Sequence, residues 1–384
     1  MTIEFEFNLP TKIEFGRGKL KKLGNFINDI NGKKVLIVTD KGLVKSGIID
    51  KVKKILDDEK ISYTVFDEVK PNPKDVDCER AYKLALQENV DSLIGIGGGS
   101  SMDTAKAVGT LLTHGGKLKN WYGFDKLRKT IPPLICIPTT AGTGSEITTF
   151  SVITDTETNY KMNIVDLKVA PQIALLDPEL TISLPKEVTA STGMDALTHA
   201  IEAYTCNVSQ PITDGLALHA IDLITEHLPI VVKDGENMES RERMLAASLM
   251  AGISFGNADV ASVHCMAESL GGLYDTPHGV ANSMMLPYVF EYNIPSNMEK
   301  HSIIARRLGA DKFDLEKNAY EGVLLLKKLA EDLNIPRMSD LEYINPEDFE
   351  YLAEGALNNI SHPSNPRKIM KKDYVDLFKK IYAE

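Results

Sequence analysis

The stretch Ser92–Val108, SLIGIGGGSSMDTAKAV, carries the pattern that decides the fold of this 384-residue chain. An apolar run of strand length leads into three glycines, Gly97–Gly99, and then into a segment of strong helix formers. Glycines let the backbone approach a bound group, and a helix N-terminus offers free N–H groups and a positive dipole end. The stretch therefore predicts a strand-turn-helix unit that holds a phosphate or pyrophosphate, with Ser100 or Ser101 capping the helix. It also fits a tight turn without a ligand, because it lacks the third glycine of GxGxxG.

Similar runs of β-branched and aliphatic residues recur through the first half of the chain. Segments of helical length, such as residues 48–59 and 76–87, separate them. Strands that alternate with helices are typical of a parallel sheet covered on both faces. The other β-rich runs are Lys34–Thr39, Tyr63–Phe66, Leu134–Ile137, Ile147–Ile153, Lys161–Val165 and Ile173–Leu176.

The pattern changes after Pro185. Apolar residues then recur at spacings of three and four, as in the series Met194, Leu197, Ile201 and Tyr204, and no further strand is evident. We therefore expect an α/β dinucleotide-binding domain with a parallel wound sheet over residues 1–184. An all-helical domain is expected over residues 185–384. A cleft between two such domains is a usual place for a ligand.

The composition excludes several classes of function. Lys plus Arg is 43 and Asp plus Glu is 54, so the net charge is −11, which disfavours nucleic-acid binding. The start, MTIEFEFNLP, has no basic stretch followed by an apolar one, so we expect no signal peptide. No uninterrupted apolar run approaches about 18 residues, so we expect no membrane span. Four scattered cysteines without a CxxC pair predict reduced thiols in a cytoplasmic protein.

A second polar loop, Pro138–Glu146 or PTTAGTGSE, directly follows a predicted strand. It places hydroxyl groups and backbone amides together, which suits phosphate or ribose oxygens. The alternative is a polar loop of turn-forming residues that binds no ligand. Two such loops after two strands of one sheet favour the ligand interpretation, because both would open at the carboxyl edge of the sheet.

Asp40 ends the first clear strand, in VLIVTD. A carboxylate there could hydrogen-bond ribose hydroxyls and repel a 2′-phosphate. An aspartate at the end of a strand is equally common as the residue that starts a turn. The spacing supports both interpretations.

Four residues of the second half suggest a metal site. Asp195 and His199, in TGMDALTHAIEAY, lie four apart in a helical pattern and therefore share one face. His264 and His278 follow in SVHCMAESLGGLYDTPHG, the first on a predicted helix and the second just past a loop. One carboxylate and three imidazoles suit Fe(II), Zn(II) or Ni(II). The alternative is a surface Asp/His pair and two structural histidines.

Several of these motifs together resemble one family. GGGSSMDTAKAV, PTTAGTGSE, the DxxxH of Asp195–His199 and HCMAESLGGLYDTPHG are similar to the iron-containing alcohol dehydrogenases. The resemblance extends from the FGRG at Phe15–Gly18 to the NPR at Asn365–Arg367. It implies a dehydroquinate synthase-like fold, with NAD(H) and a divalent metal meeting in the cleft. It also implies a cytoplasmic homodimer or higher homo-oligomer.

The resemblance implies roles for individual residues. The metal ligands would be Asp195, His199, His264 and His278. The cofactor would contact Gly98, Gly99, Ser100 and Asp103 in the first loop, Thr139, Thr140 and Thr143 in the second, and also Asn72, Lys161 and Asp40. Asp40 matches the position linked to a preference for NAD over NADP.

One position departs from the family pattern. Many alcohol-oxidising relatives have a second histidine four residues after the first metal-binding one, and here that position is Glu268. Because His264 and Glu268 are four apart, both are expected on the same helix face. Glu268 could relay protons, hydrogen-bond a ligand or repel anionic substrates, or it could turn away and pair with a cation.

The resemblance implies hydride transfer between NAD(H) and a small primary alcohol or short aldehyde, with the metal acting on the substrate oxygen. One rival is a polyol dehydrogenase of the glycerol or 1,3-propanediol type. Another is a lyase of the dehydroquinate synthase type, which uses NAD and metal without net redox change. A metal- or nucleotide-binding sensor would leave the paired sites unexplained. Net oxidation of NADH by small aldehydes distinguishes a dehydrogenase from the lyase and the sensor.

Overall fold

A computed structural model describes residues 4–384 of the chain. By its contacts the protein divides into two compact units. One is Leu9–Leu184, and the other is Pro185–Glu384 together with residues 4–8. Within the second unit, the backbone N–H of Asn8 donates to Asn257 Oδ1 at 2.5 Å.

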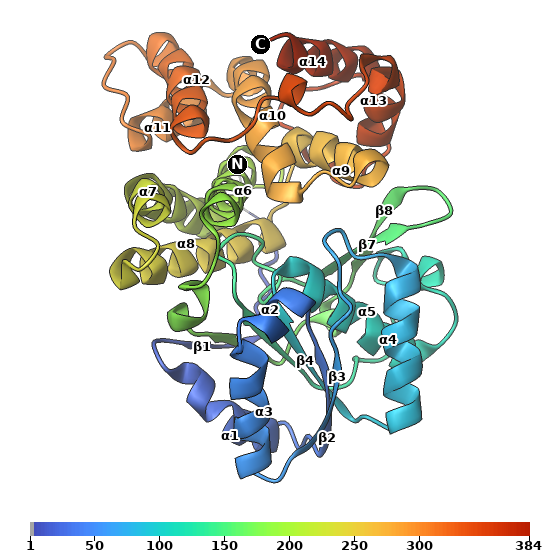
Figure 1. Cartoon of the computed structure of the whole chain (residues 1–384). Helices are drawn as coiled ribbons and strands as arrows, with labels where there is room; N and C mark the ends of the chain where they lie inside the picture. The colour runs from blue at the N-terminus through green and yellow to red at the C-terminus, as the bar shows by residue number, and fades with distance from the viewer. Residues whose placement is uncertain (1–3) are drawn as a thin grey trace. The chain divides into compact units, whose positions relative to one another are not determined.

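The first unit is built on a six-stranded sheet in the order β1-β9-β6-β4-β2-β3 (Figure 1). Every neighbouring pair in this sheet is parallel, which confirms the predicted α/β class. The strands are β1 (Lys12–Phe15), β2 (Lys34–Val38), β3 (Ser62–Phe66), β4 (Ser92–Gly97), β6 (Leu134–Pro138) and β9 (Ile173–Leu176).

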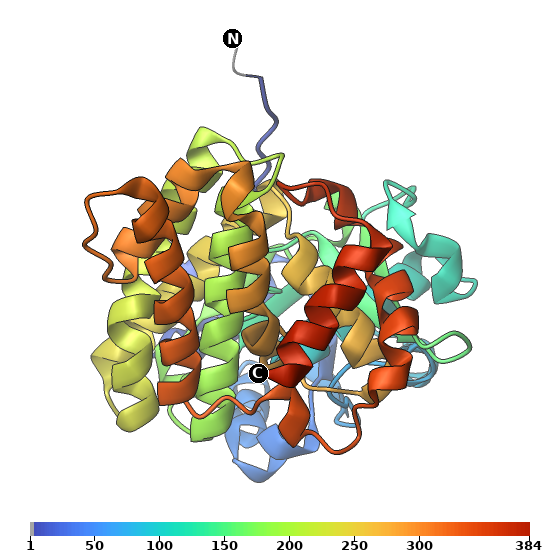
Figure 2. The ribbon, with the colours of Figure 1, turned by 90° about the horizontal axis from the view of Figure 1, so that it is seen from above.

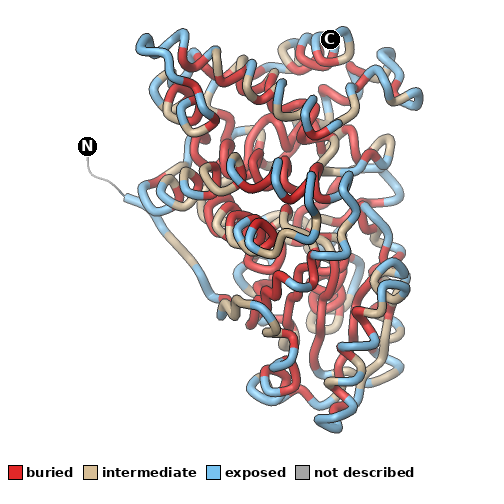
Figure 3. Tube along the Cα trace, turned by 60° about the vertical axis from the view of Figure 1, so that its left-hand side comes forward, coloured by how far each residue is buried: buried red, intermediate tan, exposed pale blue. Residues whose placement is uncertain are grey.

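Helices cover both faces of this sheet because its strands are apolar on both sides. Alternate residues of β2 enter two different cores: Val35 and Ile37 one, Leu36 and Val38 the other. The first core is closed by α1 (Leu23–Asp29) and α3 (Ile48–Asp58), and the second by α4 (Asp75–Glu88) and α5 (Gly99–His114). Every residue of β4 and β6 is buried, and Figure 3 shows buried segments running through the interior of this unit. The short helix α2 (Lys41–Lys45) follows β2.

Two features of this unit differ from the sequence prediction. The edge strand β1 was not expected, because its sequence, KIEF, is short and half charged. The β-rich stretch predicted at residues 147–153 is a strand only from Phe150, because the preceding residues form a turn in which Ile147 N–H donates to Gly144 O. This strand, β7 (Phe150–Asp155), pairs antiparallel with β8 (Tyr160–Val165). β5 (Gly123–Phe124) completes a separate three-stranded sheet.

The second unit is helical, and no strand occurs among its described residues (Figure 2). This confirms the helical second half that the sequence predicts. Its helices are α6 (Lys186–Thr205), α7 (Pro211–Lys233), α8 (Met238–Asn257), α9 (Ser262–Tyr274), α10 (His278–Asn293), α11 (Met298–Arg307), α12 (Leu315–Asp332), α13 (Phe349–Leu357) and α14 (Lys371–Ala383).

By length and composition alone, α7 is apolar enough to cross a membrane, and so is the pair α8 and α9 if its 99° bend is ignored. In the fold, α7 packs against α6 and α8. Its apolar residues Ala217, Ile221, Ile224 and Leu228 are buried there. These contacts are those of a core helix. The four cysteines are free thiols, as the sequence predicts, and all four are buried.

Candidate metal centre and nucleotide loops

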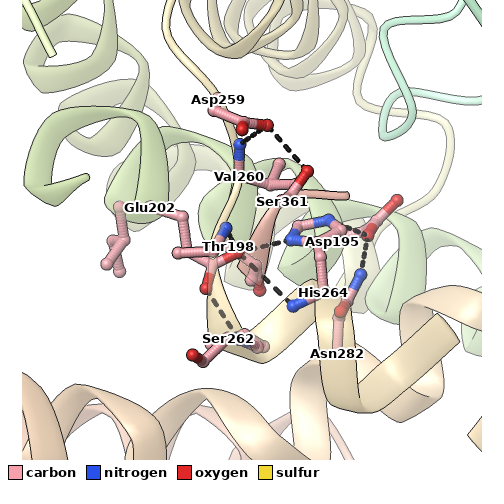
Figure 4. Close-up of polar contacts among 12 residues, drawn as sticks. Asp195, Thr198, Glu202, Asp259, Val260, Ser262, His264, Asn282 and Ser361 are labelled. Atoms are coloured by element: carbon pink, nitrogen blue, oxygen red, sulfur yellow. Dashed lines mark hydrogen bonds and ion pairs between the residues drawn. The ribbon is translucent and has the colours of Figure 1, made fainter. Parts of the chain in front are cut away.

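The four predicted metal-binding side chains lie together in the helical unit. Asp195 and His199 project from one face of α6, His264 lies in the first turn of α9, and His278 begins α10. One potential ligand atom from each lies within 4.8 Å of the other three. Asp195 Oδ1 is 3.8 Å from His264 Nε2 and 3.7 Å from His278 Nε2 (Figure 4 labels Asp195 and His264).

The burial and chemistry of this group fit a divalent ion. Asp195, His199 and His264 are buried, whereas the side chain of His278 is 28% exposed. The Nε2 atom of His264 is buried without a hydrogen-bond partner. A buried polar nitrogen without a partner is costly unless something binds it. Three imidazoles and one carboxylate are a donor set that such an ion accepts.

Local sequence explains why the three helices meet so closely. The 195/199 spacing is one helical turn, so both side chains leave the same side of α6. Asp275 ends α9 in the left-handed region, with φ 56°, and Pro277 is the N-cap residue of α10. At Gly279, an added Cβ would lie 2.4 Å from Ser191 O on α6. Only glycine allows this approach, which brings the start of α10 against α6.

Two polar partners of these residues were not predicted from the sequence. Asn282, one turn after His278, donates its amide to Asp195 Oδ1 at 2.6 Å. Glu202, three residues after His199, lies 2.6 Å from His264 Nδ1. Burial alone lowers the pKa of His264, but the hydrogen bond and charge of Glu202 outweigh it and raise that pKa. The available signal was a carboxylate at helical spacing from a candidate ligand, since metal-binding histidines commonly donate to one.

Glu268 lies one turn after His264 on α9, as expected. Its side chain is half-buried, and its Oε2 accepts a hydrogen bond from Asn359 Nδ2 at 2.7 Å. The partner is therefore a neutral amide, not the cation that the sequence argument considered.

In the α/β unit, the glycine stretch forms the predicted strand-turn-helix. Gly97 ends β4 with φ 146°, and α5 begins at Gly99 with Gly98 as its N-cap. The expected cap by Ser100 or Ser101 is wrong, because both serines already lie within the first turn of the helix. No side chain caps α5, so no side chain competes with an anion for the N–H groups at the start of this helix.

The second loop lies beside the first because β6 and β4 are neighbours in the sheet. Thr139 N–H donates to Gly97 O at 2.9 Å. An added Cβ at Gly99 would lie 3.0 Å from Thr143, so a larger residue would fill the space between the loops. Thr140 Oγ1 is buried without a hydrogen-bond partner. The two loops together form a cradle lined by backbone amides and hydroxyls.

Two further cofactor candidates, Asn72 and Lys161, are also brought together. Both are buried, and Lys161 Nζ on β8 donates to Asn72 Oδ1 at 2.9 Å. Asp40 takes the turn role that the sequence left open: its Oδ1 accepts from the N–H groups of Gly42 (2.7 Å) and Leu43 (3.1 Å) and so caps α2. These hydrogen bonds do not test whether Asp40 also contacts the cofactor, so that role stays a proposal.

The Asp103 carboxylate forms hydrogen bonds with other residues of the chain. It accepts hydrogen bonds from Ser145 Oγ at 2.6 Å and from Val152 N–H at 3.2 Å. Burial raises the pKa of this carboxyl group, and nearby Lys106 opposes the rise. Asp103 therefore ties the first turns of α5 to the end of the second loop.

Lys106, one turn further along α5, was not among the predicted residues. Its side chain is completely buried. Its Nζ donates to Ser145 O (2.7 Å), Ser145 Oγ (3.1 Å), Thr148 Oγ1 (3.2 Å) and Phe150 O (2.7 Å). A lysine inside an apolar helical pattern, in DTAKAV, was the available signal. Asp103 and Lys106 together hold residues 145–152 against α5, and we call this arrangement the α5 clamp.

Comparisons with known proteins identify the family of the chain. The model of the iron-containing alcohol dehydrogenase family matches residues 10–178, and that of the family's C-terminal region matches residues 189–382. The chain is 40% identical over 383 residues to the 1,3-propanediol dehydrogenase of Citrobacter freundii, covering 98% of this chain and 99% of that one. It is 37% identical over 375 residues to the NAD-dependent methanol dehydrogenase of Bacillus methanolicus, with coverage of 97% and 98%.

A solved structure agrees equally well. The crystal structure of 1,3-propanediol oxidoreductase matches with a TM-score of 0.95 and 39% identity, covering 99% of this chain and 100% of that one. The chain therefore belongs to the iron-containing alcohol dehydrogenase family, which confirms the resemblance read from its motifs. It is an oxidoreductase of the alcohol dehydrogenase class.

Proposed function

We propose that this enzyme transfers hydride between NAD(H) and a small primary alcohol or short aldehyde. In this proposal Asp195, His199, His264 and His278 hold a divalent metal, Fe(II) in the first instance. The observation that carries the proposal is the meeting of these four donor atoms within 4.8 Å, although they come from three helices. Zn(II) accepts the same donor set, and the ion present in the cell then depends on availability.

A divalent ion at this site would supply a Lewis acid for the oxygen of an alcohol or carbonyl. The chain contributes one carboxylate and three neutral imidazoles, so the ligand set leaves net positive charge in place, which favours an ionised alcohol. Burial of Asp195 and His264 strengthens this electrostatic effect, because water screens charges poorly there. His278 is the ligand with an exposed side, and a small substrate would approach past it.

The nicotinamide would carry the hydride, and the protein would supply binding and orientation. The uncapped start of α5, with Gly98, Gly99 and Ser100, suits the pyrophosphate. Thr139, Thr140 and Thr143 would offer hydroxyls from the second loop, and Asn72 with Lys161 would provide a further polar contact. Asp103 would act on the cofactor site indirectly, because the α5 clamp holds the end of the second loop against α5. The proposal requires the nicotinamide to reach the metal centre.

The decisive assay follows NADH oxidation with a panel of short neutral and anionic aldehydes after loading with Fe(II), Zn(II) or Mn(II). We expect net NADH consumption with at least one neutral aldehyde, dependent on the metal. Turnover without net redox change would contradict the proposal and favour the lyase.

A second substrate class, small diols, is favoured by the 40% identity to a 1,3-propanediol dehydrogenase. Comparing kcat/KM for 1,3-propanediol with that for ethanol and 1-propanol separates the two classes.

We also propose a cytoplasmic homodimer or higher homo-oligomer, as the family resemblance implies. Sedimentation velocity of the metal-loaded enzyme tests the assembly, and a monomer would contradict it.

Replacing Asp40 by serine should relax the cofactor preference. Serine retains an N-cap for α2 but removes the carboxylate that would repel a 2′-phosphate. We expect kcat/KM with NADPH to rise about 5- to 150-fold, which corresponds to about 1–3 kcal/mol. Asp40→Gly should show the same gain with a less stable α2, and exposed Asp50→Ser on α3 is the matched control. Equal kcat/KM for NADH and NADPH in the unmodified enzyme would contradict the role of Asp40.

Replacing Glu268 by glutamine tests the departure from the family pattern. The amide can keep a hydrogen bond with Asn359 but removes a negative charge one turn from His264. Because an ionised Glu268 would disfavour carboxylated substrates, we expect kcat or substrate preference to change several-fold while the metal content stays the same. The measurement is metal content and kcat/KM across the aldehyde panel. A variant identical to the parent in both would show that Glu268 is structural.

A further inference from the structure

A buried carboxylate outside the ligand set lies directly behind His264. Glu202 belongs to α6 and is only 3% exposed. Its Oε2 is 2.6 Å from His264 Nδ1 (Figure 4). An ionised carboxylate can only accept hydrogen bonds, so the imidazole donates its Nδ1–H. The unprotonated nitrogen of a neutral His264 is then Nε2, the atom that lies 3.8 Å from Asp195 Oδ1.

The same carboxylate also caps the helix that carries His264. Glu202 Oε1 accepts from Val263 N–H at 2.7 Å, and Oε2 accepts from Ala261 N–H at 2.9 Å. The N-cap residue of α9, Ala261, has no side-chain cap of its own. A negative charge at this end of a helix also interacts favourably with the helix dipole. Glu202 thus fastens the start of α9 to α6.

The spacing along α6 explains why one residue serves both purposes. Asp195, His199 and Glu202 lie at positions i, i+4 and i+7, which form one stripe on a helix. This stripe carries the two proposed ligands and, one turn further along, the Glu202 carboxylate that caps α9. His264 therefore reaches the other ligands with both its ring orientation and its helix start set by α6.

We propose that Glu202 is a positioning residue of the metal site, which holds His264 in the tautomer and place that binding requires. The proposal rests on the proposed ligand set. Such partners of metal-binding histidines typically contribute about 10- to 100-fold in metal affinity. In Glu202→Gln the side-chain amide can donate to Nδ1, which favours the opposite tautomer with the proton on Nε2.

The first test is Zn(II) affinity, measured by chelator competition on folded, metal-free enzyme. We expect Glu202→Gln to bind about 10- to 100-fold more weakly than the parent. The matched control is Asp259→Asn. Asp259 is another carboxylate near the start of α9, bonded to Ser361 and Ser364 and not to His264. The control should bind within about threefold of the parent, since only the bond to His264 carries this effect. Equal affinity of Glu202→Gln and parent, or an equal loss in Asp259→Asn, would overturn the proposal.

A second test needs neither metal nor a variant. In the metal-free parent with ¹⁵N-labelled histidine, at a pH where imidazole is neutral, His264 should carry its proton on Nδ1. A proton on Nε2 would overturn the proposal even if Glu202→Gln failed to fold. This measurement also distinguishes the proposed role of Glu202 from the proposed set of four metal ligands. A parent that shows the Nδ1–H form but binds no Zn(II) would refute the ligand set and leave the contact with Glu202 intact.

Discussion

Replacing His264 by alanine should remove the metal and lower kcat by at least about 1,000-fold. The variant loses the buried ligand at the centre of the group, and with it the Lewis acid that acts on the substrate oxygen. An effect of about 4 kcal/mol on the barrier corresponds to this factor. Metal content and steady-state kcat with the best aldehyde are the measurements.

The control is His219→Ala, which removes an exposed histidine from α7. It should keep both metal and kcat. NADH binding, followed by fluorescence, should survive in His264→Ala, because the proposed cofactor loops belong to the α/β unit. Full activity of a chelated, metal-free parent would contradict the assignment of all four ligands.

Replacing Lys106 by methionine should strongly destabilise the α/β unit. Methionine leaves the carbonyls of Ser145 and Phe150 without the Lys106 donor, and it removes from Asp103 a cation that lies 3.7 Å away. Relief of the cost of burying the ammonium group offsets part of this loss. We expect a net loss of about 3 kcal/mol, or about 6–12 °C in the melting temperature of a unit of this size.

The same variant should weaken NADH binding, because the second loop is no longer held against α5. Calorimetry and NADH fluorescence measure the two effects. The control is Lys83→Met, which replaces an exposed lysine on α4. A melting temperature within about 2 °C of that control, less than about 1 kcal/mol, would show that the α5 clamp contributes little.

The central elements of the fold could be predicted from local sequence. Residues 35–38 and 93–97 are apolar without interruption, a composition that suits a strand buried on both faces. The change to three- and four-residue spacing after Pro185 predicted the helical half for a similar reason. The strand β1 escaped prediction, because an edge strand needs few apolar residues and its pairing with β9 is made by segments far apart in the chain.

For the sites, the sequence by itself determined which residue types stand where: glycines before α5, hydroxyls after β6, and four metal-type donors at helical or loop positions. Only the tertiary structure decided what each side chain touches. It showed that Asp40 caps α2, that Asp103 faces the protein, and that Glu202 lies behind His264. These contacts depend on how separate segments pack. Periodicity reports the face on which a residue lies, but not the partner that the rest of the chain brings to that face.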